Sequence, residues 1–288
     1  MLKQRVITAV VLLALLLPAL FYASPEPFCL LVLVLIGAGA WEWGRLNGQS
    51  GLRAWALALV CVLACLSAWA LGWISRPLPL LWTVAGAAWV GIGAWLLHRG
   101  VDGWARVPVA LRLVGGLLAL SLAWLAAAQA RVIGINFLLS VLVLVWVADI
   151  GAYFAGRAFG TRFTRSRLAP SISPGKSWEG VWGGMAGVLV LAGVWVWADA
   201  AARAGAGAGS LYTRLYGVGA WLLVIAVLFL AAMSVVGDLV ESLIKRSAGV
   251  KDSSGLLPGH GGVLDRVDAL LPALPLAMML ASLAQLLR

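Results

Sequence analysis

The 288-residue sequence has few charged residues and few of the residues that bind zinc or form disulfides. Only 11% of its residues are Asp, Glu, Lys or Arg, whereas 63% are hydrophobic. Soluble domains are about one quarter charged, and disordered chains are less hydrophobic still, so the composition excludes both classes. The two His and three Cys fit neither a zinc ribbon nor a disulfide framework, because Cys29, Cys61 and Cys65 all lie in apolar runs.

Long apolar runs are what the sequence has in abundance. They cover residues 6–23, 28–44, 54–74, 78–97, 109–129, 132–156, 178–198, 216–239 and 267–287. Since about 20 apolar residues cross a bilayer as a helix, we predict an all-α, polytopic integral membrane protein with about nine transmembrane helices. The first run resembles a signal peptide, but residues 21–23 make a poor cleavage site, so we expect an uncleaved helix.

The distribution of Lys and Arg predicts the orientation. With nine crossings, sixteen of the 21 basic residues fall in loops on the side of the N-terminus and five on the other side. Cytoplasmic loops concentrate Lys and Arg, so we expect the N-terminus and the charged loops in the cytoplasm of a bacterial-type plasma (inner) membrane. This bias also explains the net charge of +10. No basic segment extends beyond short loops, so nucleic acid is not an expected partner.

The acidic residues divide the chain into two parts. Residues 1–148 contain Glu26, Glu42 and Asp102, and residues 149–288 contain the other eight of the eleven. We therefore predict a scaffold of N-terminal membrane helices, or a lipid-cavity wall, over residues 1–130. Residues 131–288 would form a catalytic membrane domain with its active site on the cytoplasmic side.

Polar residues crowd one face of the eighth run. Asp238, Glu241, Ser242 and Lys245 are spaced by three, four and seven residues, which places them on one face of a helix. A carboxylate in an apolar helix costs about 2.5–3.5 kcal/mol unless it is paired or in a wet cavity. An ion pair between Asp238 and Lys245 is the structural alternative, but it does not explain why three polar groups share this face.

The segment that follows combines glycine, acidic and basic residues. Three glycines surround His260, and Lys251 and Arg266 lie close to Asp265 and Asp268. The helix dipole would explain one acidic residue here, but not the basic neighbours. Carboxylates together with basic side chains suit a divalent cation bound to a polyphosphate. With two His and no Cys nearby, zinc fits poorly, and we predict Mg²⁺.

Two further segments are expected on the same side, because two helices separate them from the loop at 240–266. In the first, Asp149, Tyr153 and Gly156 share a helical face. In the second, Ser173-Pro174 has the pattern of a helix start. Gly175-Lys176-Ser177 is not a phosphate-binding P-loop, because Pro170 stands where that motif needs Gly.

The segment Ser242–Asp268 resembles the signature of the phosphatidate cytidylyltransferases, or CDP-diacylglycerol synthases. Residues 149–160 and 171–180 also resemble that family, whereas the first half matches it only around Arg5 and Trp41-Glu42. Two departures affect the expected nucleotide affinity: Ile150 replaces a usual Thr and Gly175 a usual basic residue. The resemblance implies a membrane enzyme of phospholipid biosynthesis that transfers CMP from CTP to phosphatidate, giving CDP-diacylglycerol and pyrophosphate.

The resemblance also implies roles for individual residues. Asp238 and Asp265 would hold one or two Mg²⁺ ions, and His260 would serve in a turn or bind phosphate, because an ionised phosphate nucleophile needs no base. The expected catalytic residues are Asp238, Asp265, Lys245, Arg246, Lys251 and Arg266. The expected substrate-binding residues are Asp149, Tyr153, Ser173, Lys176, Glu179, Ser242, Asp252, His260 and Asp268.

Two other functions are compatible with the pattern. A CTP-dependent kinase of a polyprenol or similar lipid would transfer the γ-phosphoryl group and would need a base for the hydroxyl. An ion-coupled transporter would use intramembrane carboxylates to carry ions, but the sequence has no internal repeat of the kind such transporters show. The sequence leaves the oligomeric state open, a homodimer included.

Overall fold

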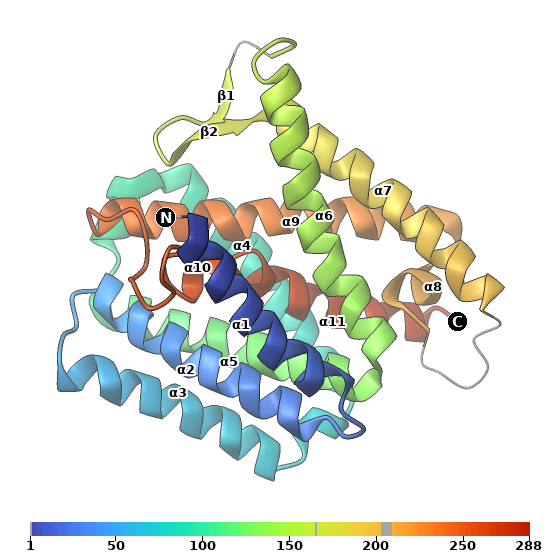
Figure 1. Cartoon of the computed structure of the whole chain (residues 1–288), viewed down its shortest axis with the longest axis horizontal. Coiled ribbons are helices and arrows are strands. Elements are labelled where there is room, and N and C mark those ends of the chain that lie inside the picture. Colours follow the sequence, from blue (N-terminus) through green and yellow to red (C-terminus); the bar gives the residue numbers. More distant parts are fainter. Residues whose placement is uncertain (1, 165, 203–208) are drawn as a thin grey trace.

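The computed structural model describes residues 2–164, 166–202 and 209–288, and helices dominate it (Figure 1). Each predicted apolar run coincides with a long helix. These helices are α1 (Leu2–Phe21), α2 (Glu26–Leu46), α3 (Leu52–Ala70), α4 (Pro79–Arg106), α5 (Val109–Ile133), α6 (Ile135–Phe159), α7 (Trp178–Ala201), α9 (Ala220–Ser247) and α11 (Leu270–Leu286). The shorter elements are η1 (Trp73–Ser75), β1 (Arg167–Ala169), β2 (Ser173–Ser177), α8 (Leu211–Tyr216) and α10 (Leu264–Val267).

The predicted class, an all-α polytopic membrane protein, is confirmed. Among the described residues, eight helical stretches are long and apolar enough to cross a membrane, with α10 and α11 counted together. The apolar part of α1, Val6–Phe21, is shorter. A ninth crossing therefore stays a prediction. Figure 1 shows α9 and α11 running through the middle of the molecule, with α2, α3 and α5 stacked below them and α6 crossing over them.

Buried polar side chains of α5 connect the N-terminal helices. Gln129 accepts a hydrogen bond from Nε1 of Trp82 (3.0 Å) and donates to the carbonyl oxygens of Trp73 (2.6 Å) and Arg76 (2.8 Å). Arg131 donates to the carbonyl oxygen of Leu20, just before the end of α1 (3.0 Å). Carbonyl groups near helix ends lack partners within the helix and must be satisfied where water is absent, and these side chains do so.

Helices α6 and α7 pack closely because glycines line their contact. A Cβ atom at Gly184 would lie 2.6 Å from the carbonyl oxygen of Ala148, and one at Gly180 would lie 2.9 Å from that of Ala152. Small residues allow such close approach of membrane helices. The hairpin of β1 and β2, which connects the two helices, is thereby fixed above the adjoining end of α9 (Figure 1).

The prediction of a helix start at Ser173-Pro174 was wrong. Both residues belong to β2, which pairs antiparallel with β1, with Ser173 opposite Ala169. Helix α7 begins at Trp178, and the Oγ of Ser177 caps it by accepting a hydrogen bond from the amide of Gly180 (3.2 Å). Ser177, directly before the apolar run, thus serves as the N-cap. The residues before it form strand β2, which pairs with β1.

Candidate active site

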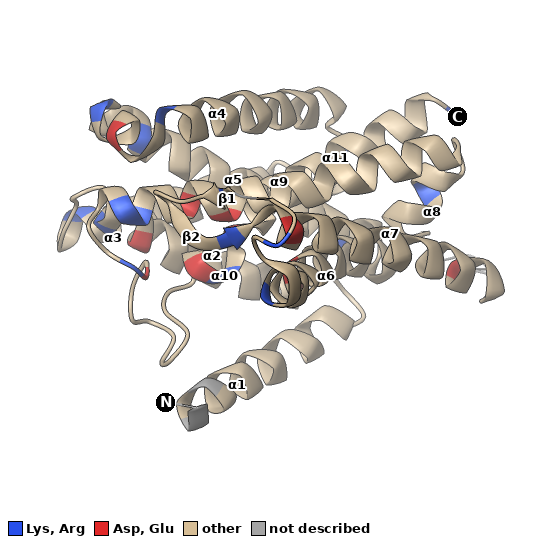
Figure 2. Ribbon diagram, turned by 90° about the horizontal axis from the view of Figure 1, so that it is seen from above, with Lys and Arg blue, Asp and Glu red and all other residues tan. Residues whose placement is uncertain are grey.

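Ten polar side chains line a cavity of about 370 Å³ where α6 and the C-terminal part of α9 meet the loop that leads into α10. They are Asp149, Asp238, Ser242, Lys245, Arg246, Lys251, Asp252, Asp265, Arg266 and Asp268. All ten were predicted as site residues, and they come from segments up to 119 positions apart. Figure 2 shows that most charged residues lie at one end of the helices, around β1, β2 and α10.

Lys245 lies between two carboxylates. Its Nζ is 2.5 Å from Oδ1 of Asp265 and also forms an ion pair with Glu241, one turn earlier in α9. All three side chains are largely buried. A buried cation flanked by carboxylates on both sides is held in place, so Lys245 presents a fixed positive charge at the cavity wall.

Asp238 pairs with Lys176 and Ser242 and not with Lys245, the partner considered in the sequence analysis. Its Oδ2 is 2.5 Å from Nζ of Lys176, which reaches down from β2, and its Oδ1 accepts a hydrogen bond from Ser242 (3.3 Å). An ion pair between Asp238 and Lys245 was therefore the wrong alternative. Lys176 does not line the cavity itself, but through Asp238 it connects the hairpin to the site.

Asp265 organises the loop from Lys251 to Val263. Its Oδ2 accepts hydrogen bonds from the amide of Ser253 (2.9 Å), the hydroxyl of Ser253 (2.9 Å) and the amide of Gly262 (2.7 Å). The turn before Gly262 needs a positive φ at Gly261 (81°), which a residue with a side chain rarely adopts. Arg266 closes the same turn by donating to the carbonyl oxygen of His260 through Nε (3.1 Å) and Nη2 (2.6 Å).

Glu42 of α2 also binds this loop, although sequence reasoning had assigned it to the scaffold. Its Oε2 accepts hydrogen bonds from the hydroxyl of Ser253 (3.1 Å) and the amide of Leu264 (2.7 Å). Its Oε1 accepts them from the hydroxyl of Ser254 and the amide of Val263 (2.9 Å). The side chain is fully buried. The available signal was a single carboxylate within an apolar run, which needs partners to be tolerated there.

Besides Lys176, four predicted substrate-binding residues lie outside the cavity lining. Tyr153 is exposed and accepts a hydrogen bond from Arg157 (3.1 Å), and Ser173 lies in β2. Glu179 is buried, and its Oε1 accepts bonds from the amides at positions 163 (3.0 Å) and 164 (2.7 Å), so it stabilises the turn after α6. His260 contributes its carbonyl oxygen to Arg266.

The charges of the cavity are nearly balanced. Five aspartates and four basic side chains line it, and Lys176 adds a further positive charge through its ion pair with Asp238. A wall of carboxylates alone would repel a phosphate, and basic side chains alone would not need carboxylates. The combination suits an anionic ligand that carries a cation with it.

Comparison with known proteins agrees with this chemistry. The model of the cytidylyltransferase family matches residues 3–284. The chain belongs to this family. The resemblance predicted from the segment Ser242–Asp268 is thus confirmed, and it extends over the N-terminal helices as well.

Family members that the chain resembles include three proteins named phosphatidate cytidylyltransferase. The protein from Pseudomonas aeruginosa is 42% identical over 288 residues, covering 96% of this chain and 95% of that protein. The protein from Haemophilus influenzae is 38% identical, covering 96% of each chain. The protein from Brucella suis is 35% identical, covering 98% of this chain and 94% of that protein.

Proposed function

We propose that this chain transfers CMP from CTP to phosphatidate, producing CDP-diacylglycerol and pyrophosphate. The observation that carries the proposal is the cavity at the end of α9, where carboxylates and basic side chains meet within a bundle of membrane-spanning helices. Such a site can receive a lipid phosphate from the bilayer and a nucleotide from water. Membership of the cytidylyltransferase family, with relatives named phosphatidate cytidylyltransferase over nearly their whole length, supports the same reaction.

The reaction requires charge neutralisation more than proton transfer. A phosphate oxygen of phosphatidate forms a bond to the α-phosphorus of CTP, and the bond from that phosphorus to the β-phosphate bridging oxygen breaks, releasing pyrophosphate. The attacking phosphate is largely ionised at neutral pH, so no strong base is needed. The two reactants repel each other, and the enzyme must hold them in line.

The basic residues of the cavity are placed to do this. Lys251 and Arg246 are exposed on its wall, where they can reach phosphates of an incoming nucleotide. Arg266 donates a hydrogen bond to the carbonyl oxygen of His260, which holds its guanidinium group beside this turn at the cavity wall. Lys245 is held between two carboxylates and supplies a charge that does not need to be ordered when substrate binds.

The carboxylates fit a magnesium ion. Oxygen ligands suit this hard cation, and the described residues contain no cluster of three or more acidic, His or Cys side chains arranged to hold a metal by themselves. Mg²⁺ is usually held by one or two carboxylates together with substrate phosphates. We propose that Asp238 and Asp265 hold it. Oδ2 of Asp265 already accepts three hydrogen bonds, so Oδ1, which is paired with Lys245, would be the oxygen that contacts the ion. When bound, the ion would withdraw charge from the phosphates.

A labelled-nucleotide assay tests the reaction directly. The purified protein in lipid–detergent micelles is given phosphatidate, Mg²⁺ and CTP labelled at the α- or the γ-phosphate. We expect the α-label to enter the lipid fraction and the γ-label to leave as pyrophosphate. Entry of the γ-label into lipid, or of neither label, would contradict the proposed function.

Lys251→Gln and Arg266→Gln should each reduce kcat/KM, because each removes a positive charge from the cavity wall. A hydrogen bond to a charged group contributes about 1.5–3 kcal/mol, so we expect a loss of roughly tenfold to hundredfold for CTP or phosphatidate. The loss should be larger for Arg266→Gln, which also releases the carbonyl oxygen of His260. The magnesium dependence should stay the same, since neither residue can bind a metal. Activity within twofold of the parent would rule out phosphate contacts.

We further propose that the cavity faces the cytoplasm and that the protein resides in the bacterial inner membrane. Cysteine labelling in intact cells tests the orientation in a variant whose three buried native cysteines are replaced by alanine. Ser166→Cys in the hairpin and Gly255→Cys in the site loop should react only after the membrane is permeabilised. Tyr216→Cys, an exposed position before α9, should react from outside. Labelling of positions 166 and 255 from opposite sides would be incompatible with a single site.

A further inference from the structure

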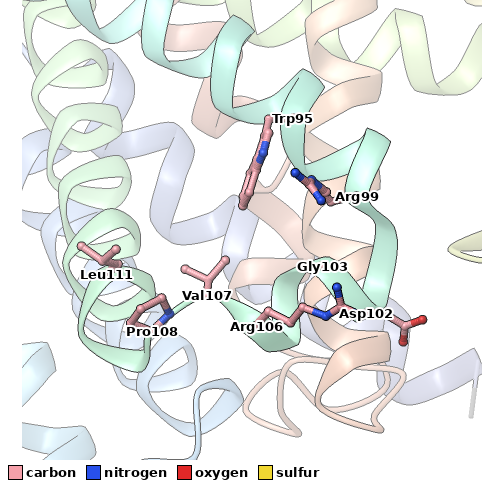
Figure 3. A pocket seen from close by; sticks show the side chains of 8 residues that line it. All are labelled: Trp95, Arg99, Asp102, Gly103, Arg106, Val107, Pro108 and Leu111. Carbon is pink, nitrogen blue, oxygen red and sulfur yellow. The ribbon is translucent and has the colours of Figure 1, made fainter.

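A second cavity lies at the corner between α4 and α5, outside the proposed active site. Its volume is about 520 Å³. It is lined by Trp95, Arg99, Asp102, Gly103, Arg106, Val107, Pro108 and Leu111. Figure 3 shows Trp95 and Arg99 on α4 facing Val107, Pro108 and Leu111 across this space. None of these residues belongs to the predicted site.

The corner has a defined structure. The helical conformation of α4 is interrupted at Gly100 (φ 66°, ψ −165°), and a Cβ atom at Gly103 would lie 2.3 Å from Cβ of Arg99. Arg112 then fixes the chain between the two helices, donating to the carbonyl oxygens of Val107 (2.7 Å) and Ala105 (2.5 Å). The cavity is therefore shaped by backbone geometry before any ligand arrives.

The basic side chains of the cavity have unused hydrogen-bonding capacity. Among the residues that the structure describes, neither Arg99 nor Arg106 has a hydrogen-bond or ion-pair partner through its side chain. By contrast, Arg112 in the same corner donates two hydrogen bonds and also lies over the ring of Trp104, 5.4 Å from its centroid. Figure 3 shows the Asp102 carboxylate pointing away from Trp95 and Val107. The lining of the cavity thus combines two exposed guanidinium groups with an apolar wall.

The location of the cavity determines which ligand fits it. Helices α4 and α5 are both long and apolar enough to cross a membrane, so their junction lies at the membrane surface. The cavity is also separate from the active site: Leu96 and Trp104 of α4 pack against Leu239 and Leu243 of α9, whose other face carries Asp238. At this depth a ligand meets lipid headgroups on one side and acyl chains on the other.

We propose that this corner binds the phosphate headgroup of an anionic phospholipid of the surrounding bilayer. The guanidinium groups of Arg99 and Arg106 contact the phosphate, since the planar guanidinium matches phosphate geometry. Trp95, Val107 and Leu111 contact the glycerol and the first methylene groups. The site goes beyond the proposed reaction, because binding here does not require the lipid to be a substrate.

Native mass spectrometry of the delipidated full-length protein tests this proposal. The probes are phosphatidylglycerol, zwitterionic phosphatidylcholine and inorganic phosphate. We expect phosphatidylglycerol to bind more tightly than phosphatidylcholine, and the double variant Arg99→Gln/Arg106→Gln to bind it at least about tenfold more weakly than the parent. Leu111→Asn should weaken the binding of phosphatidylglycerol and leave the binding of inorganic phosphate unchanged. Because the side chain of Leu111 is exposed, this substitution should not disturb folding.

The matched control is Arg53→Gln/Arg162→Gln, which removes two exposed basic residues outside the cavity, one near the start of α3 and one just after α6. It should bind phosphatidylglycerol like the parent. Equal losses in the two double variants would show a general effect of charge and overturn the proposal. Binding within twofold of the parent in Arg99→Gln/Arg106→Gln would do the same. Displacement of phosphatidylglycerol by equimolar inorganic phosphate would overturn the choice of a lipid ligand.

Discussion

Asp238→Asn should reduce the rate of CMP transfer by about a hundredfold to a thousandfold while the protein stays folded. The substitution keeps the size of the side chain and its hydrogen bond with Ser242, but it removes the negative charge that faces Lys176 and the cavity. A preorganised electrostatic contact to the reacting groups typically contributes an effect of this size. The rate is measured with labelled CTP across a magnesium titration, and the thermal midpoint is measured beside it.

The titration separates two roles of Asp238. If its carboxylate holds Mg²⁺, the concentration needed for half-maximal activity should rise in Asp238→Asn and stay constant in Lys251→Gln. Glu26→Gln is the control for charge removal, because Glu26 is exposed at the start of α2, far from the cavity along the helix. Retention of more than a tenth of the parent activity by Asp238→Asn at saturating Mg²⁺ would refute an essential role.

Glu42→Gln should inactivate the protein by loosening a loop that is 211 or more residues away in the sequence. The carboxylate accepts four hydrogen bonds, from two hydroxyls and two amides of residues 253–264. A Gln side chain offers one acceptor oxygen and turns an NH₂ group toward the remaining donors. Leaving buried donors unpaired costs about 1–3 kcal/mol each, so we expect lower thermal stability and roughly a hundredfold loss of activity.

Hydrogen exchange shows whether Glu42 acts through this loop. Amides of residues 253–264 should exchange faster in Glu42→Gln, whereas those of α6 and α7 should not change. Glu26→Gln again serves as the control, because it removes a carboxylate from the same helix without touching the loop. Loss of activity with unchanged exchange in residues 253–264 would mean that Glu42 acts in some other way. Full activity with unchanged exchange would show that the loop does not depend on it.

The two predictions concern Asp238 and Glu42. The sequence indicated a functional role for the first but not for the second. Asp238 was recognisable because Glu241, Ser242 and Lys245 follow at helical spacing, and helix geometry places such residues on one face whatever the rest of the fold does. Glu42 stands alone in its run. Its partners become apparent only when α2 packs beside the loop that precedes α10.

The amino-acid sequence by itself determined the membrane class and the positions of the long helices, and together with the family resemblance it named fifteen site residues that include the ten lining the cavity. The helices follow from apolar runs long enough for a bilayer, and the site follows from residue spacing within a turn, glycine-rich turns with distinctive charges, and the resemblance of the segment Ser242–Asp268 to a known family. Only the tertiary structure decided that Lys245 pairs with Asp265 and Glu241, that Lys176 pairs with Asp238, and that Glu42 supports the loop. The interaction between two charges depends on the distance between them, and these distances are fixed only when the helices pack together in the folded protein.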